Sequence, residues 1–295
     1  MNNMRISIVL LAAAIAIAGS GSGTCKDNGA RQGRLRSYPA GLSCEESGSD
    51  RVERILKELN EAATQLKSYQ SGIEHKVIQP LFETETLRKG VLYYQKSEKQ
   101  SKLRVNLTSL KQDDEKEQEH LEQYVINGTG LKKLGYHLTG VWLAHIDYQV
   151  RQVKIHQLAE PDPAEPNKAV DVFELIGRTF PLIGFTKTDE LRKQFEISLV
   201  EPHEAKATPS IHLRLKVKPD SVYKDDYTSI DFWIDKETHL PVRIVGTSTE
   251  QDIYKVELIR PGINKYMDER IFEIEIPEGF GKPQIMPLKS EGRSK

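Results

Sequence analysis

The most constraining feature of this sequence is an alternation of apolar and polar residues that recurs from residue 73 to residue 276. Alternation with a period of two is typical of β-strands that bury one face and expose the other. The clearest case is the stretch 229–245, where two alternating runs flank the polar segment 235–239. The apolar residues of these runs are Ile230, Phe232, Ile234, Leu240, Val242 and Ile244. We predict a β-hairpin with one apolar face.

The same alternation elsewhere indicates about eleven strands in one run, without a change of composition that would mark a second domain. Helical spacing is confined to a segment that begins at an N-cap, Asp50, and to a short pair of helices within 171–195. A twisted sheet of that size tends to curl, and so few helices cannot fill its concave side. We therefore predict an α+β fold: a curved antiparallel sheet forming an incomplete β-barrel, with an N-terminal helix and a short helical lid over the concave face.

The ends of the chain differ in composition from this central part. Residues 1–18 have Arg5, an apolar run and a small-residue cleavage pattern, which predict a signal peptide, with a buried N-terminal helix as the alternative. We predict a flexible linker at 19–49, one half-barrel domain at 50–281 and a loose tail at 282–295. The expected location is the periplasm or the cell exterior. No segment after the leader is long and apolar enough to cross a membrane.

Cys25 and Cys44 both lie in the predicted linker. In an oxidising compartment they can form a disulfide with each other. Alternatively, Cys25 carries a lipid anchor, although the preceding residues 22–24 lack the large apolar residue that is usual before such a cysteine. The sequence leaves both interpretations open.

The charges and motifs give no indication of catalysis. The 42 basic and 43 acidic residues nearly balance, so we expect no nucleic-acid partner. The metal-binding patterns His-Glu-x-x-His and Cys-x-x-Cys are absent, as are the nucleophile elbow and the phosphate loop. His145 with Asp147 resembles an acid–base pair, but the sequence supplies no third partner. We predict a protein that is not an enzyme, with no catalytic residues, metal site or cofactor.

The excess of strand over helix predicts a partly empty apolar cavity on the concave face, of the kind that binds apolar ligands. The alternative is a well-packed core without a cavity. The residues that we expect to line the cavity are Leu103, Val105, Leu107, Trp142, Leu213, Leu215, Phe232 and Ile234, with Phe180, Leu182 and Phe185 as a lid. Trp233 has the opposite parity to Phe232 and is not explained by this prediction.

Several short motifs occur in a characteristic order. They are Gly90-Val-Leu-Tyr-Tyr94 followed by Lys102-Leu-Arg-Val105, then Thr139-Gly-Val-Trp142, Asp231-Phe-Trp-Ile-Asp235 with Leu240-Pro-Val-Arg243, and Phe272-Glu-Ile-Glu-Ile-Pro277-Glu-Gly279. Over residues 50–280 this order resembles the LolA-like superfamily of periplasmic outer-membrane lipoprotein carriers. Within it, the pattern is most similar to that of secreted members from planctomycete-type bacteria.

The resemblance implies an unclosed β-barrel whose apolar cavity holds acyl chains. The carriers have an Arg-Pro pair after the second strand, linked to ligand release, whereas this chain has Lys96-Ser97 there. The expected function is therefore non-enzymatic binding of lipid or lipoprotein acyl chains by a monomer, as in a lipoprotein-sorting chaperone. The alternative is an envelope signalling or structural module that binds a protein partner, which an exposed apolar patch around Trp233 would favour. An enzyme ranks third, and a pocket containing His145 and Asp147 would favour it.

Overall fold

The structure is a computed structural model that describes residues 47–97, 101–160, 188–201 and 210–288. The helices are α2 (Gly48–Thr64), α3 (Gly128–Lys133) and α5 (Thr188–Gln194), with 3-10 helices η1 (Pro80–Phe82) and η2 (Glu269–Phe272). The strands are β1 (Ser68–Gln79), β2 (Thr84–Lys96), β3 (Ser101–Gln112), β4 (Gln118–Ile126), β5 (Val141–Asp147), β6 (Gln152–Ala159), β7 (Phe195–Val200), β8 (Ser210–Val217), β9 (Tyr227–Asp235), β10 (Pro241–Ser248), β11 (Ile253–Ile263) and β12 (Gln284–Met286). The predictions for residues 1–46, among them the signal peptide, Cys25 and Cys44, lie outside the described residues.

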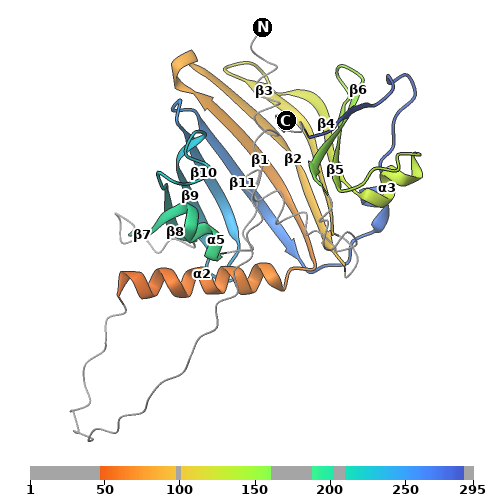
Figure 1. Cartoon of the computed structure of the whole chain (residues 1–295). Coiled ribbons are helices and arrows are strands. Elements are labelled where there is room, and N and C mark those ends of the chain that lie inside the picture. The colour runs from red at the N-terminus through yellow and green to blue at the C-terminus, as the bar shows by residue number, and fades with distance from the viewer. Residues whose placement is uncertain (1–46, 98–100, 161–187, 202–209, 289–295) are drawn as a thin grey trace, which may run out of the picture.

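All of these strands belong to one 12-stranded sheet in the order β12-β6-β5-β4-β3-β2-β1-β11-β10-β9-β8-β7. The sheet is strongly curved and does not close, so β12 and β7 form its two edges (Figure 1). Neighbouring strands run antiparallel except for β12, which pairs in parallel with β6. The predicted fold class, a curved and unclosed sheet with few helices, is confirmed. β12 lies in the segment that we had assigned to a loose tail.

Helix α2 lies across one end of the sheet (Figure 1). Its N-cap is Ser47 rather than the predicted Asp50, because the Ser47 side chain accepts a hydrogen bond from the backbone N–H of Asp50 at 3.2 Å. The apolar stripe of the helix buries Ile55, Leu56 and Leu59 against the sheet. The helix therefore covers part of the concave face, as predicted.

The predicted hairpin is formed by β9 and β10, with Phe232 opposite Ile244 and Ile230 opposite Gly246. Its turn is held by Asp235, whose Oδ1 accepts hydrogen bonds from the backbone N–H groups of Glu237 and Thr238 at 3.1 and 2.8 Å. The hairpin prediction is confirmed.

Two glycines of the sequence motifs are required by close backbone contacts. A Cβ atom at Gly90 would lie 1.9 Å from the carbonyl oxygen of Asn106, beside an irregularity in the β2–β3 pairing. Gly140 has a φ of +85°, and a Cβ there would lie 2.2 Å from the carbonyl oxygen of Ala159. These motif positions are therefore explained by chain packing.

The strand expected at 272–276 is wrong, because Phe272 ends η2 and residues 273–276 have an irregular conformation. The segment is held by side chains from the sheet instead of by a strand ladder. Nη1 of Arg104 donates to the carbonyl oxygens of Ile271 and Glu273, both at 2.9 Å, and Nδ2 of Asn127 donates to that of Phe272 at 2.9 Å. These bonds satisfy backbone groups that a strand partner would otherwise satisfy.

The buried side chains form one apolar cluster on each face of the sheet. The first joins Leu103, Leu213 and Phe232, which belong to strands far apart in the sheet order. Such distant strands can share a cluster only on the concave face, where their side chains converge. The second cluster joins Val125, Ala144 and Ile155 to Leu131 of α3 and to Ile274, so it lies on the convex face of β4, β5 and β6.

Candidate functional site

Most of the predicted lining residues lie together on the concave face. Leu103, Leu107, Leu213, Leu215, Phe232 and Ile234 all belong to the concave cluster. Val105 packs against this cluster and is partly buried. The residues form a continuous apolar floor, with the side chains of Leu213, Leu215 and Phe232 fully buried. The parity assigned from the sequence is therefore correct for these positions.

Trp142 does not lie on this floor. It belongs to the convex cluster with Ala144 and Ile146, whereas the adjacent Leu143 belongs to the concave cluster. The indole Nε1 donates a hydrogen bond to the carbonyl oxygen of Thr139 at 2.6 Å. Successive side chains of a strand point to opposite faces, so the structure places Trp142 on the other side of the sheet from the predicted cavity.

The predicted lid residues Phe180, Leu182 and Phe185 lie outside the described residues.

A groove opens between α2 and the edge strand β7, with a cavity volume of about 680 Å³. This volume is within the roughly 300–1,000 Å³ that is typical of small-molecule sites. The apolar residues that line the groove are Val52, Leu56, Phe195, Ile197 and Leu199. Leu56 and Phe195 also belong to the concave cluster, so the groove leads directly onto the apolar floor.

None of these groove residues is predicted to bind a ligand from the sequence alone. Their helical and alternating patterns are visible in the sequence, but contact between α2 and β7 joins segments more than a hundred residues apart. Local periodicity carries no information about such a contact.

Charged residues surround the mouth of the groove. Arg51 pairs with Glu201 at 2.6 Å, and Arg192 pairs with Glu53. Nζ of Lys218 donates a hydrogen bond to the backbone carbonyl oxygen of Arg192 at 2.6 Å. These ion pairs join α2 to α5 and to the residue after β7, and they are largely exposed, so each stabilises the packing of α2 only weakly.

The concave side of β1 to β6 also carries a polar group of residues. Burial, together with the nearby charge of Arg88, lowers the pKa of His75 to about 4. Burial would raise the pKa of Glu122, but hydrogen bonds from Tyr124 and His120 and the charge of Arg88 bring it below its ordinary value. Burial of the Tyr124 hydroxyl and the negative charge of Glu122 raise the pKa of Tyr124. Glu122 is therefore held ionised.

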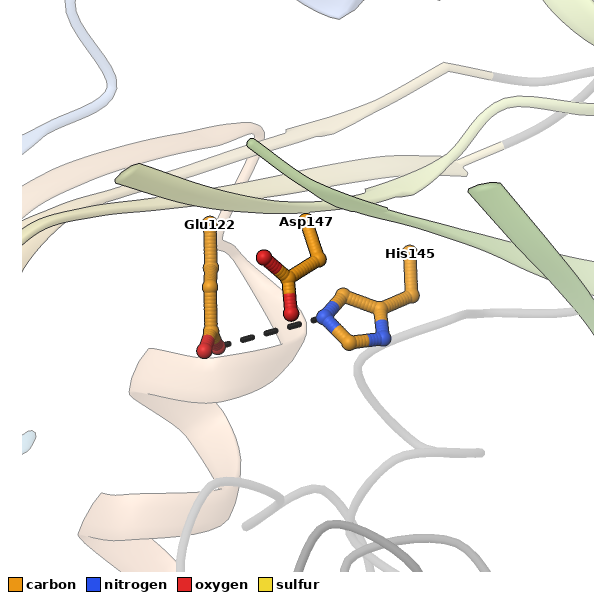
Figure 2. Close-up of side chains that lie close together, drawn as sticks. All are labelled: Glu122, His145 and Asp147. Atoms are coloured by element: carbon orange, nitrogen blue, oxygen red, sulfur yellow. Dashed lines mark ion pairs between the residues drawn. The ribbon is translucent and has the colours of Figure 1, made fainter. Parts of the chain in front are cut away.

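His145 and Asp147, the pair noted in the sequence, lie beside Glu122 in this polar region (Figure 2). Burial lowers the pKa of His145, although the charges of Glu122 and Asp147 act in the opposite direction. No third partner for this pair was visible in the sequence, because Glu122 is on the neighbouring strand and its place depends on the register.

Trp233 lies on the convex face within a cross-strand stack. Its ring stacks on His212 with centroids 4.2 Å apart, and the guanidinium of Arg243 lies 4.7 Å from the ring centroid. The three residues are paired in register across β8, β9 and β10. The aromatic and cation–π contacts therefore explain an indole on the polar face.

No family model matches the chain, and no curated protein matches it. Solved structures with a similar fold include an uncharacterized conserved protein from Thermus thermophilus, with 10% identity and a TM-score of 0.43, covering 80% of this chain and 99% of that one. The MucA/MucB complex of Pseudomonas aeruginosa gives 13% identity and a TM-score of 0.40, and covers 76% of this chain and 61% of that one. This chain thus spans less than two thirds of the MucB structure.

A LolA superfamily protein from Nitrosomonas europaea gives 11% identity and a TM-score of 0.30, covering 75% of this chain and 96% of that one. Identities and TM-scores this low carry no information about family or function. Among the described residues, no helix is long and apolar enough to span a membrane.

Proposed function

We propose that this protein is an exported, non-enzymatic binding protein that holds acyl chains of a lipid or lipoprotein against its concave apolar face. The observation that carries the proposal is the groove between α2 and β7, whose apolar lining continues into the concave cluster. An acyl chain can enter between Val52 of the helix and Ile197 of the strand. It can then replace apolar packing contacts of the concave cluster.

An acyl chain held in the groove would gain affinity from the methylene groups that it removes from water. Each methylene group removed from water contributes about 0.8 kcal/mol, so ten buried methylenes contribute about 8 kcal/mol. The loss of translational freedom and the ordering of the chain offset part of that free energy. The net result is a reversible affinity, which suits a protein that loads and releases its ligand.

A fluorescent fatty acid tests the groove directly. The purified protein should bind the probe, and Ile197→Asp should weaken binding about tenfold or more, because a charge in the apolar lining opposes burial of the chain. Leu81→Asp is the matched control, because Leu81 is an apolar residue 72% exposed in η1 and away from the groove. Equal affinities of wild type and Ile197→Asp, or no probe binding at all, would refute the groove as the acyl site.

The natural ligand requires protein taken from its own cell envelope. Native mass spectrometry of such protein should show an added mass that dissociates as a lipid or an acylated peptide. A preparation that carries no lipid while still binding the fluorescent acid would limit the proposal to free fatty acids. The export leader is tested in the same sample, since N-terminal sequencing should begin after residue 18.

We further propose that the protein acts as a monomer, in the periplasm or outside the cell. Size-exclusion chromatography with light scattering should give the mass of one chain less its leader.

A further inference from the structure

The polar region of the concave face contains a cluster of Glu122, His145 and Asp147, contributed by the adjacent strands β4 and β5. In the register of these strands, Glu122 is directly opposite Asp147, and Tyr124 is directly opposite His145. Figure 2 shows the three side chains of the cluster directed toward one another. Like charges placed directly opposite each other destabilise a sheet. A positive charge beside Glu122 and Asp147 relieves this repulsion, and a bound cation can contribute to it.

The distances within the cluster fit a small cation. One ligand atom from each residue lies within 4.8 Å of the others. Nε2 of His145 is 3.9 Å from Oε2 of Glu122. The same Nε2 is buried and has no hydrogen-bond partner among the described residues. A buried nitrogen without a partner is costly unless something binds it.

Neighbouring groups hold the ligands in place. The Tyr124 hydroxyl donates to Oε2 of Glu122 at 2.7 Å, and Nε2 of His120 lies 2.8 Å from Oε1. The Tyr124 ring stacks on the His145 imidazole at 4.4 Å with an interplanar angle of 5°. Orienting contacts of this kind accompany protein metal ligands and fix their geometry.

We propose that Glu122, His145 and Asp147 bind a divalent transition-metal ion such as Zn²⁺, with solvent completing the coordination. Ligand atoms at about 2.1 Å from a tetrahedral zinc are separated by about 3.4 Å. The distances between the ligand atoms therefore need to shorten by at most about 1.4 Å to enclose the ion. One imidazole with two carboxylates favours zinc-like ions over Ca²⁺ and Mg²⁺, which require six or more oxygen ligands.

Two positive side chains act on the same cluster. Arg88 and Lys154 both lower the pKa of His145, and Arg88 also lowers that of Glu122. Both positive charges oppose the entry of a cation, so coordination by the imidazole nitrogen is needed, which favours a transition metal.

Titration of the metal-free protein with Co²⁺ tests this site without any assay of function. We expect one ion per chain, with visible absorption bands of four-coordinate cobalt, and displacement of cobalt by Zn²⁺. His145→Gln and Asp147→Asn should each weaken binding about tenfold or more. Tyr124→Phe keeps the ring stack but removes the hydroxyl, and should weaken binding less.

The control is His212→Gln on the convex face, where Nε2 of His212 lies 2.7 Å from Oδ1 of Asp231. This variant removes a similar histidine–carboxylate pair and should leave cobalt binding unchanged. A fixed Zn²⁺ concentration that saturates wild type should also raise its melting temperature by more than that of Asp147→Asn. Absence of stoichiometric binding, or binding that persists in both cluster variants, would overturn the proposal. The result does not depend on whether the groove binds acyl chains.

Discussion

Replacement of Gly140 by alanine tests a close backbone approach at the start of β5. Gly140 precedes β5 with a φ of +85°, and an added Cβ would lie 2.2 Å from the carbonyl oxygen of Ala159. Gly135 has the same φ of +85° but nothing within 4 Å of an added Cβ. Alanine at either position adopts an unfavourable left-handed conformation, whereas only Gly140→Ala also creates a clash.

The difference between the two variants measures the clash. The left-handed conformation costs about 1–2 kcal/mol, of which reduced freedom of the unfolded chain offsets up to about 1 kcal/mol. Gly135→Ala should therefore destabilise the protein by about 1 kcal/mol. In Gly140→Ala the start of β5 must move away from β6, which disrupts the pairing of Val141 with Ala159 and adds about 1–3 kcal/mol.

Urea unfolding followed by circular dichroism should resolve this difference. We expect Gly140→Ala to lower the free energy of unfolding by about 3 kcal/mol and the melting temperature by roughly 6–12 °C. If both variants lost the same stability within about 0.5 kcal/mol, the close approach of residue 140 to Ala159 would be wrong.

Other predictions concern the core, pH and the C-terminal segment. Phe232→Ala should lower the free energy of unfolding by about 3–5 kcal/mol in the same assay, because Phe232 is 0% exposed. A loss below about 1 kcal/mol would contradict its place in the core. Burial lowers the pKa of His75 from 6.5 to about 4. As the pH falls, the unfolded chain therefore binds the proton before the folded chain does. The folded protein should lose roughly 1–3 kcal/mol of stability between these two pH values. His75→Gln should flatten that part of the pH profile, and an unchanged profile would contradict the burial of the imidazole. Arg104→Met should speed hydrogen exchange in residues 269–276, and unchanged exchange would contradict the observed anchoring.

The sequence predicts the concave face well because strand parity is a local property. Leu213 and Leu215 alternate with polar neighbours, and each has its predicted face. The curvature of the sheet also follows from the sequence, since a long run of strands with few helices leaves one face without a covering layer. These features need no knowledge of which strands are neighbours.

Trp142 shows where parity fails. Residues 141–144 are all apolar, because β5 is covered on both faces: by the concave cluster on one side, and by α3 with Ile274 on the other. A strand that is buried on both sides has no alternation, and a shift of one residue reverses the face. The segment 272–276 shows the opposite error, since it alternates like a strand but is held by the side chains of Arg104 and Asn127.

The two proposed sites share the concave face but no residues, which allows a test of their independence. The metal cluster is on β4 and β5, whereas the groove is formed by α2 and β7 at the other end of the strand order. Binding at two sites is coupled only if both ligands change one common element, and any coupling must be reciprocal. We expect no coupling, because the strands between the sites are continuously paired.

Fatty-acid affinity should therefore change by less than about twofold on saturation with Zn²⁺, and Ile197→Asp should bind cobalt as wild type does. Asp147→Asn should conversely bind the fluorescent acid normally. If each ligand instead changed the affinity for the other by about tenfold or more, about 1.4 kcal/mol, the acyl chain would lie against Glu122 and His145. The concave face would then act as one cavity, with an apolar end at α2 and a metal-bearing end at β5.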